Sequence, residues 1–414
     1  MSIWRKICCC LYPETEVDVD KNTRLLPLED RLMQKIDTPL KVLAYGIVPP
    51  QFHQSRLPEN YCSDGIKKVV CGNKHTLILT KSNYILACGD NHYGQCAKDP
   101  FAQEEIGSEE IIEESLTLKL HAFNVENHEI LDIAAGSNHS LILAKPFSGG
   151  RAKVMAFGHE VACGFLDKTD KWKPTEVEMP PEYSHKEVVK VFAGQMRSGV
   201  LLESGEVLAW GEWFDVAKQR SPQRIEINLE EGDSVVSASF GKMSAVLLTK
   251  QGRIYTVGDN TYGELGLPSE ITSSIQATQV KTFRNKRIVE VDSGARHCIV
   301  LQENGKVYTF GDNSEGQCGI DYNRTYRPQQ VDIGDLEPWK VFAGDSHSGF
   351  ITKQGEMYLW GDNTAGRLGT SESTSIFKPS LLQDSLGFHV CGVALGGYIS
   401  VFILGTKEMS LVKH

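Results

Sequence analysis

The chain has 414 residues, 41% of them hydrophobic, and its 43 basic and 53 acidic side chains give a formal net charge of −10. This length suits one large repeat architecture, and the acidic balance excludes an overall positive field of the kind that holds nucleic acid. The chain shows no apolar run long enough for a membrane span and no signal peptide. We therefore expect it to fold in the cytoplasm or nucleus, with its eleven cysteines mostly as free thiols.

Residues 1–40 match nothing later in the chain and predict a flexible N-terminal arm. Three adjacent cysteines, Cys8, Cys9 and Cys10, follow Trp4-Arg5-Lys6. Two or three acyl chains anchor a protein where one does not, so one interpretation is a palmitoylated arm that tethers the chain to a cytosolic membrane face. The other is three free thiols, and both interpretations stay open.

From residue 41 onward the chain repeats one pattern, which is clearest in Val291–Gly319. Gly294 and His297 open the pattern, and an apolar run leads to the turn Glu303-Asn304-Gly305. A second apolar run ends at Gly311-Asp312-Asn313. An Asn-Gly turn between two such runs predicts a β-hairpin. A single hairpin cannot bury its own faces in water, so the copies are expected to pack against one another.

Recurring glycines count the copies, whose period is near fifty residues. The strand missing from the seventh copy appears at the other terminus, as Lys41–Gly46, with Met409-Ser410-Leu411-Val412 as a competitor. The pattern therefore predicts an all-β fold: a seven-bladed β-propeller in residues 41–414, closed by an N-terminal strand in the last blade. The leading glycines are Gly72, Gly136, Gly194, Gly241, Gly294, Gly344 and Gly396, and the closing glycines are Gly89, Gly158, Gly211, Gly258, Gly311 and Gly361.

The chain resembles the regulator of chromosome condensation repeat family. Residues 291–319 and 341–369 (VFAGDSHSGFITKQGEMYLWGDNTAGRLG) carry that family's pattern, and the resemblance covers roughly residues 41–412. It implies seven blades of four strands each. Founding members of the family are guanine-nucleotide exchange factors for Ran, so it also implies exchange on a small Ras-like GTPase. Asp259, His297 and Asp312 are the analogues of contact residues by repeat position.

Alternating strand directions place the Gly-x-x-His turns and the Gly-Asp-Asn loops on one face of the ring, and the glycine hairpins on the other. Two insertions interrupt the repeat. Residues 101–120 are expected on the first face, and residues 146–151 on the second. The first insertion is acidic and includes Glu104, Glu105, Glu109 and Glu110.

Two polar residue types recur once per blade and suggest chemistry. Copies in different blades lie far apart, so we interpret the histidines as structural groups that fix the strand-end turn. We interpret the aspartates as turn-forming residues, although together they would make an acidic face that attracts a basic partner. The histidines are His75, His139, His297 and His347, and the aspartates are Asp90, Asp259, Asp312 and Asp362.

Aromatic residues divide into core and surface candidates. Tyr45, Trp210, Phe310 and Trp360 precede a closing glycine and are expected between blades, whereas Trp172 and Trp213 depart from that position and are expected to be exposed. We find no nucleophile with a base and an orienting group, no phosphate loop and no metal-ligand spacing, so no enzyme activity, metal or cofactor is predicted.

The sequence therefore predicts a monomeric, non-catalytic scaffold that binds a protein partner and no nucleic acid. Exchange on a small GTPase is the alternative function. The candidate partner-binding residues are Glu104, Glu105, Glu109, Glu110, Trp213, Asp259, His297 and Asp312.

Overall fold

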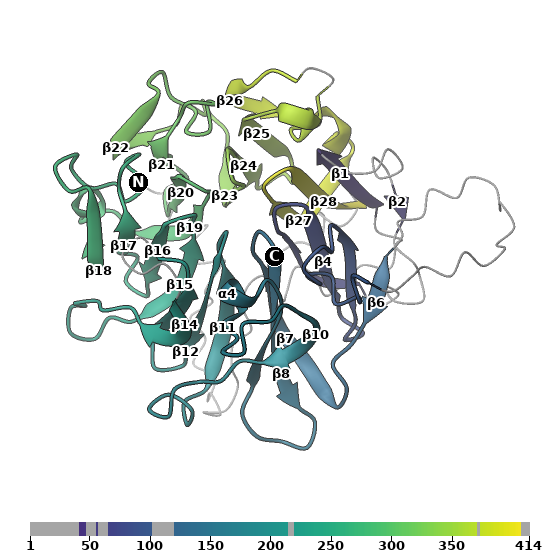
Figure 1. Ribbon diagram of the computed structural model, residues 1–414. Coiled ribbons are helices and arrows are strands. Elements are labelled where there is room, and N and C mark those ends of the chain that lie inside the picture. The colour runs from purple at the N-terminus through teal and green to yellow at the C-terminus, as the bar shows by residue number, and fades with distance from the viewer. Residues whose placement is uncertain are drawn as a thin grey trace, which may run out of the picture.

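A computed structural model describes residues 41–46, 55–56, 65–101, 120–213, 219–370 and 373–406. These residues form seven four-stranded antiparallel sheets in a ring around a central channel (Figure 1). The prediction of a seven-bladed propeller is confirmed. The arm 1–40, the acidic residues of the first insertion and the competing strand 409–412 lie outside the described residues.

Each blade runs from an inner strand at the channel to an outer strand at the rim. Blades 1 to 3 consist of β3 (Ile66–Cys71), β4 (His75–Thr80), β5 (Ile85–Gly89), β6 (His121–Phe123); β7 (His128–Ala135), β8 (His139–Pro146), β9 (Lys153–Gly158), β10 (Lys171–Glu176); and β11 (Val188–Ala193), β12 (Arg197–Leu202), β13 (Val207–Gly211), β14 (Gln219–Arg224). Blades 4 to 6 consist of β15 (Val235–Phe240), β16 (Ser244–Thr249), β17 (Ile254–Asp259), β18 (Ser273–Gln279); β19 (Ile288–Ser293), β20 (His297–Gln302), β21 (Val307–Asp312), β22 (Arg324–Gln330); and β23 (Pro338–Ala343), β24 (His347–Thr352), β25 (Met357–Gly361), β26 (Ile376–Leu381). The short helices are α4 (Glu160–Cys163), η2 (Lys281–Phe283), η3 (Thr364–Gly366) and η4 (Gln383–Ser385).

Blade 7 joins the two ends of the chain. Its strand order is β27 (Phe388–Leu395), β28 (Ile399–Thr406), β1 (Lys41–Gly46) and β2 (Ser55–Arg56). Strand β1 runs antiparallel to β28 along its whole length, from Lys41 opposite Leu404 to Gly46 opposite Ile399. The predicted closure by an N-terminal strand is therefore confirmed.

The two ends of the ring differ in the segments that they carry. We call the end with the Gly-x-x-His turns and the segments after the closing glycines the loop face, and the opposite end the hairpin face. The two kinds of loop-face segment are joined by backbone bonds, such as Asp259 N to Met243 O at 2.8 Å and Asp312 N to Arg296 O at 2.9 Å. On the hairpin face Gly305 has φ of 85°, as the predicted Asn-Gly turn requires.

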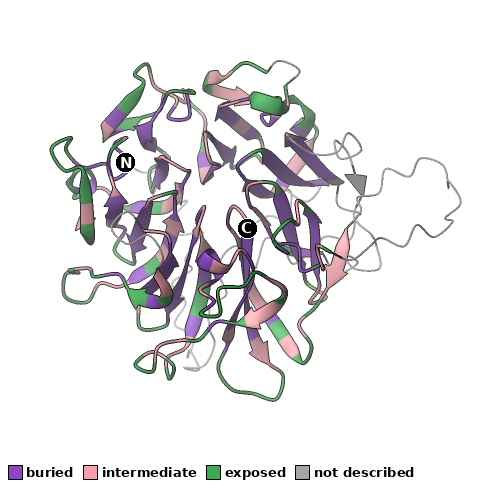
Figure 2. Cartoon of the chain, in the orientation of Figure 1, coloured by how far each residue is buried: buried purple, intermediate pink, exposed green. Residues whose placement is uncertain are grey.

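The core consists of seven clusters of buried side chains, one between each pair of neighbouring blades. Figure 2 shows buried residues filling the blades and exposed residues in the loops and at the rim. Four predicted core aromatics are confirmed there: Trp210 between blades 2 and 3, Phe310 between 4 and 5, Trp360 between 5 and 6, and Tyr45 between 6 and 7. Each blade therefore buries its faces only through its neighbours.

The leading glycines form a closed inner ring because neighbouring blades approach too closely there for any side chain. A Cβ on Gly294 would lie 2.3 Å from Gly344 O and 2.2 Å from His297 Cε1. A Cβ on any other leading glycine would likewise lie too close to the carbonyl oxygen of the leading glycine in the next blade. In the last blade, a Cβ on Gly396 would lie 2.1 Å from Gly72 O, which closes the ring. Close packing, and not φ, explains the glycine at this repeat position.

Candidate functional site

The four repeated histidines link neighbouring blades. In each, Nε2 lies within hydrogen-bond distance of the Oγ of a serine in the next blade, and three of these serines also donate to a loop carbonyl. In these three pairs the serine Oγ therefore accepts a hydrogen bond from Nε2–H. The predicted role in the histidine's own turn is corrected, because a backbone bond such as Gly294 N to His297 O (2.9 Å) already closes that turn. The pairs are His75–Ser140 at 3.0 Å, and His139–Ser198, His297–Ser348 and His347–Ser400 at 2.9 Å.

Burial keeps these imidazoles neutral. It lowers the pKa of His75 to about 4 and of His139 and His297 to about 3, and it also lowers the pKa of His347. His297 is 1% exposed. The structure therefore corrects its assignment as a partner contact, because its ring presents no surface to a partner.

In blade 3 an arginine replaces the histidine. Arg197 donates to Lys242 O at 2.6 Å and Ser244 O at 3.3 Å in blade 4, and its guanidinium lies 4.5 Å from the centre of the Trp213 ring. Trp213 packs its edge toward Phe240 in the core between blades 3 and 4. Trp213 is expected from the sequence to be exposed, but Arg197 and Phe240 hold it half-buried.

The other tryptophan expected at the surface is also half-buried. A Cβ on Gly94, in the blade 1 loop, would lie 2.6 Å from the Cβ of Trp172 on β10 of blade 2. Trp172 therefore packs against the neighbouring loop as part of a blade contact.

The loop-face aspartates form the turns in which they stand. Asp259 Oδ1 accepts hydrogen bonds from Thr261 N at 3.1 Å and Thr261 Oγ1 at 2.6 Å, and Asp312 Oδ1 accepts one from Ser314 N at 3.1 Å. Asp90 makes the equivalent bond at 3.2 Å and Asp362 at 2.7 Å. This geometry agrees with the turn-forming interpretation. Asp259 remains half-buried and Asp312 is 8% exposed.

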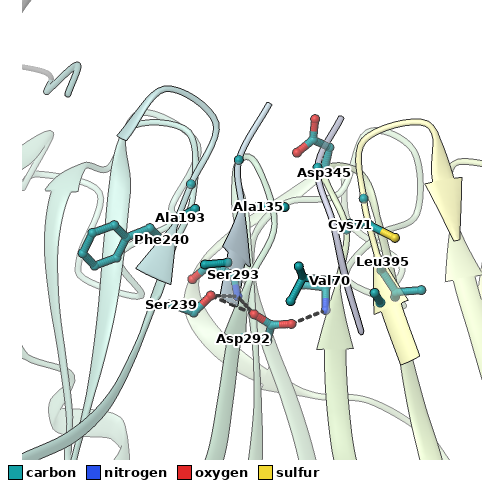
Figure 3. A pocket seen from close by; sticks show the side chains of 18 of the residues that line it. Val70, Cys71, Ala135, Ala193, Ser239, Phe240, Asp292, Ser293, Asp345 and Leu395 are labelled. Atoms are coloured by element: carbon teal, nitrogen blue, oxygen red, sulfur yellow. Dashed lines mark hydrogen bonds between the residues drawn. The ribbon is translucent and has the colours of Figure 1, made fainter. Parts of the chain in front are cut away.

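The central channel, of about 280 Å³, is lined by the inner strands (Figure 3). Half-buried Asp292 accepts hydrogen bonds from Ser239 Oγ at 2.7 Å, Ser293 N at 2.9 Å and Ala343 N at 2.8 Å, and so ties blades 4, 5 and 6 together. Burial raises the pKa of its carboxyl group. Near the loop face, Gln195 Nε2 donates to Asp345 Oδ2 at 2.8 Å. Because these residues belong to blades 3 and 6, their bond crosses the channel.

The cysteines in the described ranges are free thiols; five are buried, and Cys71 and Cys391 are half-buried. Burial raises the pKa of Cys71, Cys88 and Cys298 to about 12, so these thiols are poor nucleophiles. No three His, Cys, Asp or Glu side chains among the described residues gather as a metal site. Within the same ranges no helix is long and apolar enough to cross a bilayer.

The loop face exposes large apolar side chains that the sequence patterns do not indicate. Phe101 is 88% exposed, Tyr322 70% and Leu166 61%, and they follow the closing glycines of blades 1, 5 and 2. Ile271, in the same segment of blade 4, is more than one-third exposed. These segments differ in length, so no repeat position marks the residues. An apolar residue inside a polar loop was the available signal.

A family model described as the RCC1-like domain matches residues 45–402. The E3 ubiquitin-protein ligase HERC2 of Homo sapiens is 32% identical over 300 residues, which take in 68% of this chain and 6% of that protein. The human X-linked retinitis pigmentosa GTPase regulator is 28% identical over 259 residues, or 62% of this chain and 24% of that protein. This chain therefore spans a small part of both relatives.

A solved structure shows the same fold. The crystal structure of Prp20p from Saccharomyces cerevisiae, a protein studied for its binding to Gsp1p and histones, aligns with a TM-score of 0.73. The alignment covers 94% of this chain and 97% of that chain at 19% identity. At this identity the likeness concerns the fold alone.

Proposed function

Because the chain belongs to the family of RCC1-like domains, we propose that it is a propeller scaffold that binds a protein partner on its loop face. The observation that carries this proposal is the set of large apolar side chains exposed on that face, Phe101, Leu166 and Tyr322 above all. These residues stand in loops of blades 1, 2 and 5, and exposed aromatic residues supply much of the binding energy of protein interfaces. Rigid blades hold these loops in place.

The test compares the two faces of the ring. Affinity capture uses the full chain with Leu166→Ser and Tyr322→Ser, and a matched control with Phe147→Ser and Leu386→Ser, two hairpin-face residues that are 69% and 50% exposed. We expect the loop-face variant to lose at least nine-tenths of a specific partner and the control to retain it. Equal retention by both variants would refute the proposed surface.

The predicted contacts Glu104, Glu105, Glu109 and Glu110 lie outside the described residues, and their contribution is tested by replacing all four with Gln.

We also propose that the N-terminal arm tethers the scaffold to a cytosolic membrane face. The support is in the sequence, since Cys8, Cys9 and Cys10 adjoin basic and aromatic residues and two or more acyl chains give stable anchoring. Hydroxylamine-sensitive palmitate labelling should vanish when the three cysteines are replaced by Ser. An unlabelled parent chain would end this proposal.

Guanine-nucleotide exchange on a small Ras-like GTPase is the second candidate function. The observation that favours it is the half-buried Asp259 carboxylate on the loop face, together with one relative named as a GTPase regulator and a fold neighbour that binds Gsp1p. Release of fluorescent GDP from a panel of purified GTPases tests it. Acceleration that Asp259→Asn reduces at least tenfold would support exchange, and no acceleration with any GTPase leaves the scaffold alone.

A further inference from the structure

Two arginines and a tyrosine meet on the loop face between blades 4 and 5. Tyr262 stands in the loop after β17, Arg296 in the turn before β20, and Arg324 at the start of β22. The guanidinium carbons of Arg296 and Arg324 lie 4.3 Å and 6.0 Å from the centre of the Tyr262 ring. We call these three residues the Arg–Tyr cluster. Stacking on an aromatic ring restricts a guanidinium and so reduces the entropy lost when it binds a ligand.

The two guanidinium groups have no protein acceptor within the described part of the chain. Neither Arg296 nor Arg324 forms an ion pair within 4.0 Å or a side-chain hydrogen bond there. The neighbouring carboxylates are held elsewhere: Asp259 by Thr261, Asp312 by Ser314, and Glu264 by the backbone N–H of Tyr262 at 2.7 Å. Each guanidinium carries five donors in a fork that matches a carboxylate. The cluster therefore presents oriented donors without acceptors.

The surroundings select the charge and the shape of the ligand. Lys242 is exposed on the neighbouring turn of blade 4 and adds a positive charge. Asp259 and Asp312 lie in the same two loops, and their charges repel a dianion more strongly than a monoanion. Tyr322, two residues before Arg324, is 70% exposed and offers an apolar contact beside the donors. A singly charged carboxylate next to an apolar or aromatic group fits this surface better than a phosphate group.

From this arrangement we propose that the Arg–Tyr cluster binds an Asp or Glu side chain in an acidic segment of the protein partner. The proposal rests on the proposed function and specifies the chemistry of its partner. Arg296 and Arg324 hold the carboxylate, Tyr262 positions both guanidinium groups, and Tyr322 contacts a neighbouring apolar side chain of the segment.

A random 12-residue peptide library displayed on phage and selected on the full chain tests the proposal. We expect enriched peptides to contain Asp or Glu beside an apolar residue. The consensus peptide, labelled with fluorescein, should bind at least tenfold more weakly to the variant with Arg296→Ala and Arg324→Ala. The matched control removes two hairpin-face arginines, Arg151→Ala and Arg284→Ala, for the same change in net charge, and should bind like the parent. The variant with Arg296→Lys and Arg324→Lys keeps the charge but loses the forked donors of the guanidinium group, and should bind three- to tenfold more weakly.

Several outcomes would overturn the proposal. These are enriched peptides without acidic residues, equal losses in the cluster variant and its control, or unchanged binding when Asp and Glu of the peptide become Asn and Gln. A phosphoserine peptide that binds tenfold more tightly would assign the cluster to phosphate, and an enlarged species in sedimentation that only the cluster variant abolishes would assign it to a second copy. If Leu166→Ser with Tyr322→Ser abolishes partner capture while the cluster variant does not, this inference alone fails.

Discussion

Each histidine–serine pair keeps a neutral imidazole between two blades, so protonation must oppose folding. The pKa of His139 is lowered by burial from 6.5 to about 3 in the folded chain. As pH falls below 6.5 the unfolded chain binds the proton first, and the free energy of unfolding decreases until pH approaches the folded pKa. At pH 5 this loss is about 2 kcal/mol for each such histidine. We expect His139→Gln to flatten the dependence of stability on pH between 6.5 and 4 by about one proton.

Urea denaturation at several pH values measures the proton count. His185→Gln is the control, because His185 is exposed on the hairpin side of blade 3, and it should leave the slope unchanged. A slope that His139→Gln does not change would contradict the assignment of a neutral, buried imidazole.

The sequence predicts a structural role for these histidines but not their partners. In the structure, histidine occurs where the next blade supplies serine one position later: Ser140, Ser198, Ser348 and Ser400. Where Arg197, Ser244 and Ile399 replace it, the next blade has Ala245, Cys298 and Thr76. This covariation is visible in the printed sequence. The covariation is missed when each histidine is interpreted within its own turn, because its hydrogen-bond partner lies in the next repeat.

The loops that follow the closing glycines of blades 1, 4 and 5 share one buried contact, in which a side chain accepts a hydrogen bond from the backbone N–H two residues earlier. Gln95 and Gln317 accept from Tyr93 N and Glu315 N, both at 2.9 Å. In blade 4 the acceptor is Glu264, whose side chain is 2% exposed. In blades 1 and 5 the neutral amide of a glutamine therefore accepts the loop N–H that Glu264 accepts in blade 4.

Replacing Glu264 by Gln should therefore stabilise the protein at alkaline pH. Burial, with a smaller contribution from Asp259, raises the pKa of Glu264 from 4.5 to about 7. An acid with a raised folded pKa weakens folding as pH rises from its unfolded to its folded pKa, because the folded chain keeps the proton longer. We expect Glu264→Gln to be more stable than the parent by about 3 kcal/mol at pH 8 and equal to it below pH 4.5.

Chemical denaturation across this pH range is the measurement. Gln317→Glu is the reciprocal variant, and we expect it to lose stability at pH 8 and regain it in acid. If Glu264→Gln and the parent show the same pH profile, the buried carboxyl group does not titrate as its surroundings indicate.

The strands could be predicted from the sequence, but the Arg–Tyr cluster on the loop face could not. The strands follow from alternating apolar residues between glycines that recur at fixed spacing. Tyr262, Arg296 and Arg324 occupy two loops and a strand start in different blades, and only the ring brings them together. Their encounter depends on the angle between blades, which no local pattern encodes.

The whole molecule depends on a circle of seven apolar interfaces. Each of the seven core clusters joins two adjacent blades, and the cluster between blades 7 and 1 contains Val42 and Ala44 from β1 together with Ile66 and Ile78 from blade 1. The number of blades and their closure could be predicted from the sequence, because leading glycines count the blades and the unmatched strand at residue 41 completes the last one. The channel-crossing bond of Gln195 to Asp345 could not be predicted, because it joins blades that are not neighbours.

Deleting β1 should therefore open the ring, whereas deleting the arm should not. We expect a chain that starts at residue 41 to melt within about 2 °C of the full chain. A chain that starts at residue 47 loses Leu43 and Tyr45 from the interface of blades 6 and 7 and Val42 and Ala44 from that of blades 7 and 1. Truncating a single buried leucine to alanine already costs about 2–5 kcal/mol. The loss of four buried side chains and the β28 pairing exceeds the whole stability of a typical domain. Circular dichroism melting and gel filtration should show this shorter chain unfolded or aggregated at 25 °C. A compact, cooperatively melting chain without residues 1–46 would show that blades 1 to 6 stand without closure.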